Sequence, residues 1–294
     1  MPHPTVIPIE AKSALNRVEG MPFRWSLNPY RGCGHGCVFC YARRTHTFLE
    51  RTGLQDWQTV LYAKVNMPAV LRRELARRTW RHETVLIGSA TDPYQPVEGR
   101  FRLMRGILSA LADHATPARI ITRSPLIVRD RDLLLRLART AGVRIAVSVA
   151  TLDEQLARRL EPGVAPPRQR LRVVRMLADA GLAVDVALAP VMPGLTDAPE
   201  HLRELVAAAR TAGAVGLWHG TLHLGEVTRE SVFDFLRAYA PALLSRYERL
   251  YSGRYAPRFY TDAVADRVAA EIASAPFHPP PTERPQRPKQ LSLL

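Results

Sequence analysis

The sequence has few cysteines, few lysines and no long apolar run, and each shortage excludes a class of protein. Three cysteines in 294 residues cannot build the disulfide framework of a small secreted domain. The chain contains no run of eighteen apolar residues and no N-terminal apolar segment, so the sequence predicts neither membrane insertion nor export. We therefore expect a cytoplasmic protein with no membrane partner.

Lysine occurs at only three positions, so arginine carries nearly all of the positive charge behind the formal net charge of +14. A basic surface attracts the phosphate backbone of nucleic acids through counterion release. A GC-rich coding bias would enrich arginine equally well without any function. DNA or RNA is therefore one candidate partner, although residues 71–82, which place arginines around an amphipathic helix, are more typical of a solvated face.

The pattern of apolar residues indicates a parallel sheet within one large domain. Short β-branched runs alternate with helix-period segments from residue 84 onward. The expected strands are residues 23–28, 84–90, 118–122, 143–149, 182–190 and 214–220. The expected helices are residues 102–114, 130–142, 169–181, 199–213 and 229–244. Six such units predict an α/β fold, an incomplete (β/α)6 TIM-like barrel.

Composition divides the chain into four expected regions. Residues 1–22 are an N-terminal extension, and residues 23–225 hold the partial barrel. Residues 226–274 are expected to form a helical segment packed on the barrel. Residues 275–294 are polar and rich in proline, which predicts a disordered tail. The sequence leaves the oligomeric state open.

All three cysteines lie within eight residues, directly after the first expected strand. Cys33, Cys37 and Cys40 have the spacing C-x3-C-x2-C. Soft thiolates select zinc or iron–sulfur clusters, and a cubane cluster with three protein ligands leaves one iron open to another ligand. The alternative is a zinc site completed by His35 or His46, in a non-catalytic module that binds nucleic acid through its arginines. Structural zinc sites usually pair two separated knuckles, and the sequence offers no second one.

The cysteine motif, with Phe39 before its last cysteine, resembles that of the radical S-adenosylmethionine (radical SAM) superfamily. Five segments are together similar to its spore-photolyase-like branch, whose members are often labelled DNA repair photolyases: NPYRGCGHGCVFCYAR, SATDPYQPVE, ITRSPLIVRD, LEPGVAPPRQRL and PVMPGLTD. The similarity runs from about Ala11 to about Gly225. It implies a radical enzyme that takes an electron from a flavodoxin or ferredoxin, cleaves S-adenosylmethionine reductively and abstracts a hydrogen atom from a substrate, with nucleic acid as one candidate.

The resemblance also implies how the cofactors are held. Cys33, Cys37 and Cys40 would ligate three irons of a [4Fe–4S] cluster, and the amino and carboxylate groups of S-adenosylmethionine would chelate the fourth. Phe39 would pack near the adenine, with backbone contacts from Tyr41.

The same resemblance assigns cofactor contacts to residues that follow the later strands. Thr91 and Asp92 would engage the methionine amino group, Arg123 the methionine carboxylate, and Ser148 the carboxylate or the ribose. Each has a plain alternative: Asp92 suits a turn in which it caps its own backbone, and Ser148 suits a bond to a neighbouring carbonyl. Glu98 suits either the cofactor or a cap on the following helix.

The sequence does not identify a catalytic residue. Repair of the spore photoproduct uses a further cysteine just before the Ser/Thr-Asp pair, but the corresponding position here is Ala90, so repair by that route is in doubt. Tyr94 is a weak candidate for relaying a hydrogen atom, and otherwise a packing tyrosine. His219 and His223, at the end of the last expected strand, are weak candidates for substrate contacts, and otherwise part of the wall.

Overall fold

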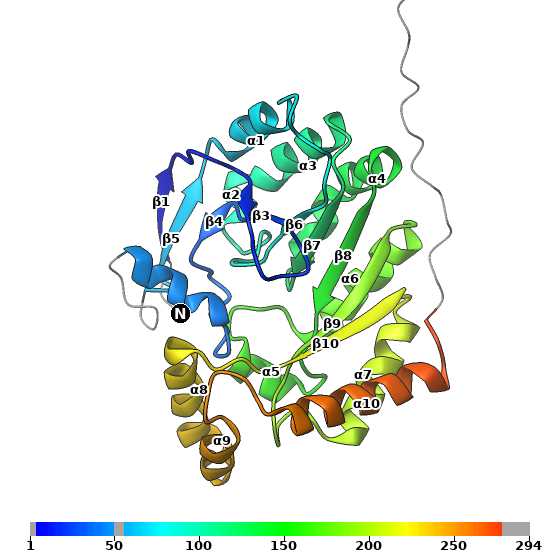
Figure 1. Cartoon of the computed structure of the whole chain (residues 1–294). Helices are drawn as coiled ribbons and strands as arrows, with labels where there is room; N and C mark the ends of the chain where they lie inside the picture. Colours follow the sequence, from blue (N-terminus) through cyan, green and yellow to red (C-terminus); the bar gives the residue numbers. More distant parts are fainter. Residues whose placement is uncertain (1–3, 50–55, 278–294) are drawn as a thin grey trace, which may run out of the picture.

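The computed structural model describes residues 4–49 and 56–277, and a twisted sheet with six parallel strands organises it (Figure 1). In spatial order these strands are β3 (Trp25–Leu27), β6 (Val85–Ile87), β7 (Ala118–Thr122), β8 (Val143–Ser148), β9 (Ala183–Val191) and β10 (Gly216–Thr221). Spatial order equals chain order, as successive crossovers in one direction require. The incomplete six-unit α/β barrel expected from the sequence is confirmed.

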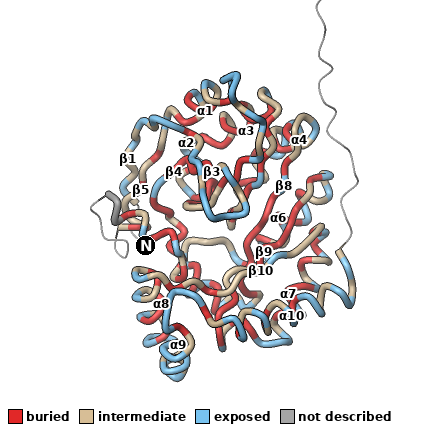
Figure 2. The backbone as a smooth tube through the Cα atoms, viewed as in Figure 1, coloured by how far each residue is buried: buried red, intermediate tan, exposed pale blue. Residues whose placement is uncertain are grey.

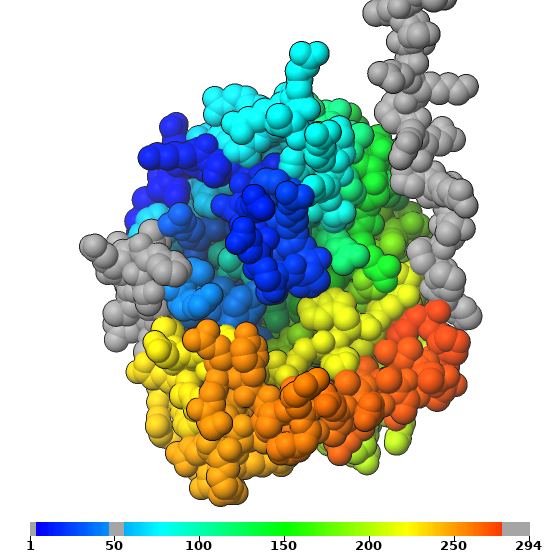
Figure 3. All heavy atoms as spheres, in the orientation of Figure 1, coloured from blue at the N-terminus to red at the C-terminus, as the bar shows by residue number. Residues whose placement is uncertain are grey.

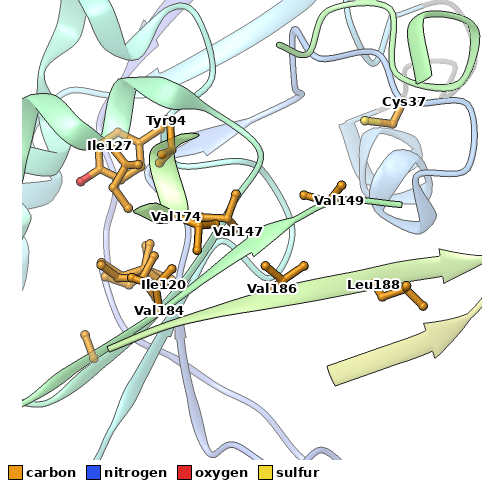
Figure 4. Packing of buried hydrophobic residues seen from close by; sticks show 14 of the residues in the cluster. Cys37, Tyr94, Ile120, Ile127, Val147, Val149, Val174, Val184, Val186 and Leu188 are labelled. Carbon is orange, nitrogen blue, oxygen red and sulfur yellow. The ribbon is translucent and has the colours of Figure 1, made fainter. Parts of the chain in front are cut away.

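Helices connect the strands of this sheet. They are α1 (Met67–Leu75), α2 (Glu98–Phe101), α3 (Leu103–Asp113), α4 (Arg131–Thr140), α5 (Glu154–Leu160), α6 (Pro167–Asp179) and α7 (Pro199–Thr211). Of these, α4, α6 and α7 pack on the strands, and α3 packs between α1 and α4. The buried faces of sheet and helices meet in one core, where Ile120, Val147 and Val184 pack beside Val174 (Figure 4). Figure 2 shows β8 and β9 as almost continuously buried, in agreement with their largely apolar sequences, which Arg144 and Asp185 interrupt as an ion pair.

The amphipathic helix expected over residues 71–82 is shifted toward the N-terminus. It begins at Met67, because Pro68 suits the first turn, and ends at Leu75. The chain then turns so that Trp80 packs edge-on against Trp25, with ring centroids 5.5 Å apart, and donates its indole N–H to Thr116. Tertiary packing of this tryptophan therefore outweighs the helical pattern.

A second, three-stranded sheet was not expected from the sequence. β5 (Val60–Lys64) pairs in parallel with β1 (Thr5–Ile9) and antiparallel with β4 (Tyr30–Arg31). β2 (Asn16–Arg17) pairs antiparallel with β3 at the edge of the main sheet. The N-terminal residues thus belong to both sheets, and β4 leads directly into the cysteine motif.

The C-terminal part is helical. Figure 3 shows it as a band from yellow to red along one side of the molecule. It contains α8 (Glu226–Tyr239), α9 (Leu244–Leu250) and α10 (Arg258–Ser274), of which α10 packs on α7 and β10. Most of the expected disordered tail, residues 278–294, lies outside the described residues. Within the described ranges, no helix is both long enough and apolar enough to cross a bilayer.

Candidate cofactor site

A cavity of about 260 Å³ lies at the carboxyl ends of the parallel strands. The structure brings every predicted cofactor residue to this cavity: Cys33, Cys37, Phe39, Cys40, Tyr41, Thr91, Asp92, Arg123 and Ser148. These residues come from the cysteine loop and from the ends of β6, β7 and β8. Their common place agrees with the rule that working residues gather at the carboxyl ends of parallel strands.

Glycine allows the cysteine loop to turn tightly enough to present its thiols to the cavity. Gly32 has φ +74°, and a Cβ there would lie 2.7 Å from the carbonyl oxygen of Val60. Beyond the loop, the Arg43 guanidinium donates hydrogen bonds to the carbonyls of Gly36 and Cys37. These bonds hold the backbone of the cysteine loop in place. Cys33 and Cys37 are buried, with 7% and 6% of their surface exposed.

Burial raises the pKa of all three thiols, and that of Cys33 reaches about 12. For Cys33 the charges of Asp92 and Cys40 act in the same direction, while backbone hydrogen bonds from Asp92 and His35 oppose them. Without a metal these cysteines are therefore protonated at neutral pH. Iron binding requires the thiolates, so loading the site releases protons.

The residues of the cavity fit a multinuclear cluster better than a single ion. In the described part of the chain, no group of three His, Cys, Asp or Glu side chains is placed to hold one metal ion. His35 donates from Nδ1 to the Gly163 carbonyl at 3.0 Å and has Nε2 3.2 Å from Asp92, while His46 Nε2 lies 3.0 Å from the Val60 carbonyl. Both histidines considered for a zinc site have other partners. The thiols still share one cavity, as ligands to different irons of one cluster require.

Asp92 is the most heavily bonded polar group of the cavity wall. Its Oδ1 accepts hydrogen bonds from the Tyr94 N–H at 2.9 Å and the Thr122 hydroxyl at 2.7 Å. Its Oδ2 accepts one from the Arg123 N–H at 2.6 Å. Burial opposes ionisation, but the charge and hydrogen bond of His35, together with Thr122 and Arg123, leave the pKa of Asp92 lowered. The turn alternative for Asp92 is therefore correct, and the carboxylate ties the end of β6 to the end of β7.

Arg123 lies over the ring of Phe39, with Cζ 5.5 Å from the ring centroid. Its Nε donates to Glu161 at 2.8 Å and its Nη2 to the Ala189 carbonyl at 3.2 Å. Burial alone would lower the pKa of Arg123, but Cys37 and Glu161 outweigh burial and raise it. The cavity therefore holds a permanent positive charge beside the thiols.

Comparison with known proteins identifies the family of this chain. The family model of the Radical SAM superfamily matches residues 27–206. This chain belongs to the radical SAM superfamily. Radical SAM enzymes use a [4Fe–4S] cluster and S-adenosylmethionine and need a reductant, so these are the cofactors of this chain.

The two relatives compared by sequence are uncharacterized, and the solved structure compared is similar in fold. An uncharacterized protein of Mycobacterium tuberculosis is 43% identical over 293 residues, which cover 96% of this chain and 86% of the relative. An uncharacterized protein of Methanocaldococcus jannaschii is 24% identical over 192 residues, covering 65% of this chain and 70% of the relative. The structure of a spore photoproduct lyase complexed with dinucleoside spore photoproduct has a TM-score of 0.68 at 14% identity, covering 92% of this chain and 79% of that one. At this identity the likeness establishes the radical SAM partial-barrel fold.

The weak catalytic candidates are not brought together at the radical SAM cavity. Tyr94 is fully buried and lies beside Ile127, well apart from Cys37 (Figure 4), and it does not line the cavity. His219 is also outside the lining, whereas His223 belongs to it. Glu98 accepts hydrogen bonds from the N–H groups of Leu103 and Met104, which confirms the capping alternative for this residue.

Several residues that shape the cavity were missed from the sequence. Asn28 Oδ1 accepts hydrogen bonds from the N–H groups of Ala90 and Thr91, which fixes the loop after β6. Trp218, on β10, lines the cavity with 40% of its surface exposed. Glu161 sits in the quoted LEPGVAPPRQRL segment, but its partner Arg123 is far away in sequence. No pattern in the sequence indicated that Glu161 pairs with Arg123.

Lys64 holds the backbone at Asn28 and makes the stability of the fold depend on pH. Its Nζ donates to the Asn28 carbonyl at 2.8 Å, and burial, aided by Arg31, lowers its pKa from 10.5 to about 8. Between pH 8 and 10.5 the unfolded chain therefore holds more protons than the folded one, so the unfavourable contribution of the buried Lys64 charge to folding declines as pH rises. We expect the unfolding free energy of the wild type, minus that of Lys64→Met, to increase by up to about 3 kcal/mol across this range. Urea denaturation at each pH measures it, and a constant difference would contradict the lowered pKa.

Proposed function

We propose that this radical SAM enzyme removes a hydrogen atom from a nucleic-acid base that is held unpaired at the cavity mouth. The observation that carries the proposal is that one cavity joins three cysteines, two of them buried, and an arginine with 21% of its side chain exposed to an exposed aromatic rim. When bound, the cluster and S-adenosylmethionine supply the reductive cleavage and the radical chemistry. The protein supplies binding, orientation and exclusion of water.

Each predicted cofactor residue has a role in the proposal that its position supports. Cys33, Cys37 and Cys40 hold the cluster. Arg123 binds the methionine carboxylate of S-adenosylmethionine, because a guanidinium in the cavity wall with unused N–H groups suits a planar anion. Phe39, beneath Arg123, offers its ring to the adenine.

Further contacts come from the wall of the cavity. The Tyr41 hydroxyl donates to the Ser89 carbonyl, which holds this ring at the mouth. Thr91 and Ser148 are buried at the ends of β6 and β8 and line the cavity, which supports a place for them beside the cofactor. The Asp92 carboxylate already has four partners, so we assign it to positioning the loops.

The rim of the cavity supports a planar substrate. We define the aromatic rim as Tyr41, Trp218, His223 and Tyr255. The His223 ring meets Tyr255 edge-on at 4.8 Å and Tyr41 at 6.4 Å, and Tyr255 has 68% of its surface exposed. Aromatic side chains beside basic residues bind unpaired bases by stacking, whereas phosphates add a salt-dependent attraction. The net charge of +14 favours such a partner.

The reaction proposed here differs from that of a spore photoproduct lyase at one position. Ala90 lines the cavity where that reaction uses a cysteine, and the chain has no cysteine outside its motif. The hydrogen donor expected for that reaction is therefore missing from this chain. A flavodoxin or ferredoxin as the reductant and a cytoplasmic location stay predictions from the sequence.

The decisive assay is release of 5′-deoxyadenosine from S-adenosylmethionine by protein that has been purified anaerobically and reconstituted with iron and sulfide. With dithionite as electron source, we expect release that increases when single-stranded DNA or RNA is added. Colourless protein that retains zinc and releases nothing would refute the enzyme reading. Release that nucleic acid never changes would refute the proposed substrate.

Trp218→Ala tests the aromatic rim. We expect affinity for a single-stranded oligonucleotide to fall by about 5- to 100-fold, the loss that follows from removing one stacked base. Fluorescence anisotropy with a labelled oligonucleotide at several salt concentrations measures it. Phe259→Ala is the matched control, because Phe259 on α10 is an aromatic side chain even more exposed than Trp218, 73% against 40%, but does not line the cavity. Equal affinities of the two variants, or binding that salt does not weaken, would contradict the rim as a nucleic-acid site.

A further inference from the structure

Behind the cavity wall, two arginines share one buried carboxylate. Glu161 Oε1 accepts from Arg123 Nε at 2.8 Å, and Glu161 Oε2 accepts from Arg170 Nη2 at 2.6 Å. Only 1% of the Glu161 and Arg170 side chains is exposed. Arg170 also donates from Nη1 to the Ser148 carbonyl at 2.7 Å, which anchors this group to the end of β8.

We infer that Glu161 is a positioning residue for S-adenosylmethionine, because it fixes the Arg123 guanidinium in the cavity wall beside the thiols. This inference rests on the proposed role of Arg123 in binding the cofactor's carboxylate. Arg123 has five N–H groups. Glu161 and the Ala189 carbonyl take one each, which leaves three donors on the two terminal nitrogens. The bond to Glu161 therefore determines which edge of the Arg123 guanidinium remains free to bind the cofactor carboxylate.

Charge balance supports an anion at this edge. Two arginines and one glutamate leave one net positive charge in a group of which Glu161 and Arg170 are buried and Arg123 is 21% exposed, and charge held away from water without a counter-ion is costly. Part of that charge is balanced by the cluster thiolates, since Cys37 and Arg123 interact electrostatically. The cofactor carboxylate supplies a second anion of matching geometry.

Glu161 also has a fixed place relative to the cysteine loop. The connection between α5 and α6 holds this loop through backbone bonds on both sides of Glu161: Val38 N–H to the Leu160 carbonyl at 2.9 Å, and Gly163 N–H to the His35 carbonyl at 3.0 Å. The loop that carries the thiols and the carboxylate that orients Arg123 are therefore one unit. Their spacing does not depend on the length or flexibility of the arginine.

The test compares two ligands that differ only in the carboxylate. Calorimetry on anaerobically reconstituted protein measures the Kd of S-adenosylmethionine and of decarboxylated S-adenosylmethionine. In Glu161→Gln we expect the first Kd to rise by about tenfold or more, the loss typical of a misplaced charged hydrogen bond. The second Kd should change little, so discrimination between the ligands falls. The change in the electron paramagnetic resonance spectrum of the reduced cluster on adding S-adenosylmethionine should weaken in parallel.

Glu154→Gln is the matched control. Glu154 is the first residue of α5, whereas Glu161 directly follows its last residue. Glu154 likewise accepts from an arginine, Arg168 at 2.6 Å, but on the surface and outside the cavity lining, so both Kd values should stay at wild-type levels. Unchanged discrimination in Glu161→Gln, or an equal loss for both ligands, would overturn the inference. If Glu161→Gln does not fold, Arg170→Lys takes its place, and the same loss of discrimination is expected because lysine keeps the charge but loses one of the two anchors. Wild-type protein that never cleaves S-adenosylmethionine would instead refute the proposed function.

Discussion

Replacing Cys37 with alanine is expected to reduce release of 5′-deoxyadenosine by at least about 100-fold and to prevent assembly of an intact cluster. The motif supplies one thiolate to each of three irons, and a missing ligand exposes an iron that no other cysteine can reach, since the chain has only three. Cys37 is also buried against the core, so alanine removes a sulfur of modest volume without adding a polar group. The fold should persist. Iron and sulfide content, the visible spectrum and 5′-deoxyadenosine release measure the effect.

Val38→Ala is the neighbouring control for this substitution. Val38 contributes its backbone N–H to the Leu160 carbonyl, and alanine retains that bond. Iron content and release should therefore remain close to those of the wild type. A Cys37→Ala protein with a full cluster and undiminished release would show that Cys37 is not a ligand. Zinc bound in place of iron in the wild type would show that the thiols form a structural site.

The main sheet could be predicted from the sequence because its signal is local. Buried β-branched runs such as Ala118–Thr122 are bounded by turns and followed by helical periods. Strand ends were less predictable. The strand expected over residues 84–90 stops at Ile87, because Gly88, with φ +95°, turns the chain against the carbonyl of Ile121. That turn creates the loop carrying Thr91 and Asp92, so the error in the boundary falls at the site itself.

The site was predictable where residue chemistry alone is informative. Three cysteines at fixed spacing indicate a metal ligand set before any fold is known. The pairing of Arg123 with Glu161 and Arg170 gave no such signal, because charged residues are normally exposed and nothing local marks Glu161 and Arg170 as buried. The pairing of β1 with β5 was missed because it joins segments more than fifty residues apart through backbone groups, which no local sequence pattern marks.

Gly163→Ala is expected to separate the connection between α5 and α6 from the cysteine loop. A Cβ at this position would overlap the carbonyl oxygen of Gly34 and lie 2.9 Å from the Cα of His35. Both neighbours are backbone atoms, so relief requires the loop itself to move. We expect a loss of about 2–3 kcal/mol in unfolding free energy, the usual cost of overpacking. Urea denaturation of the apoprotein measures that loss.

The displaced loop should also hold iron poorly, because the Gly163 N–H and His35 carbonyl would no longer meet at 3.0 Å. Iron content after reconstitution tests this separately from stability. Gly99→Ala is the control: its Cβ meets nothing within 4 Å in α2, where alanine is a better helix former than glycine. A Gly163→Ala protein as stable and as rich in iron as Gly99→Ala would mean that the cysteine loop keeps its shape without this connection. Orientation of Arg123 by Glu161 would then be independent of how the thiols are held.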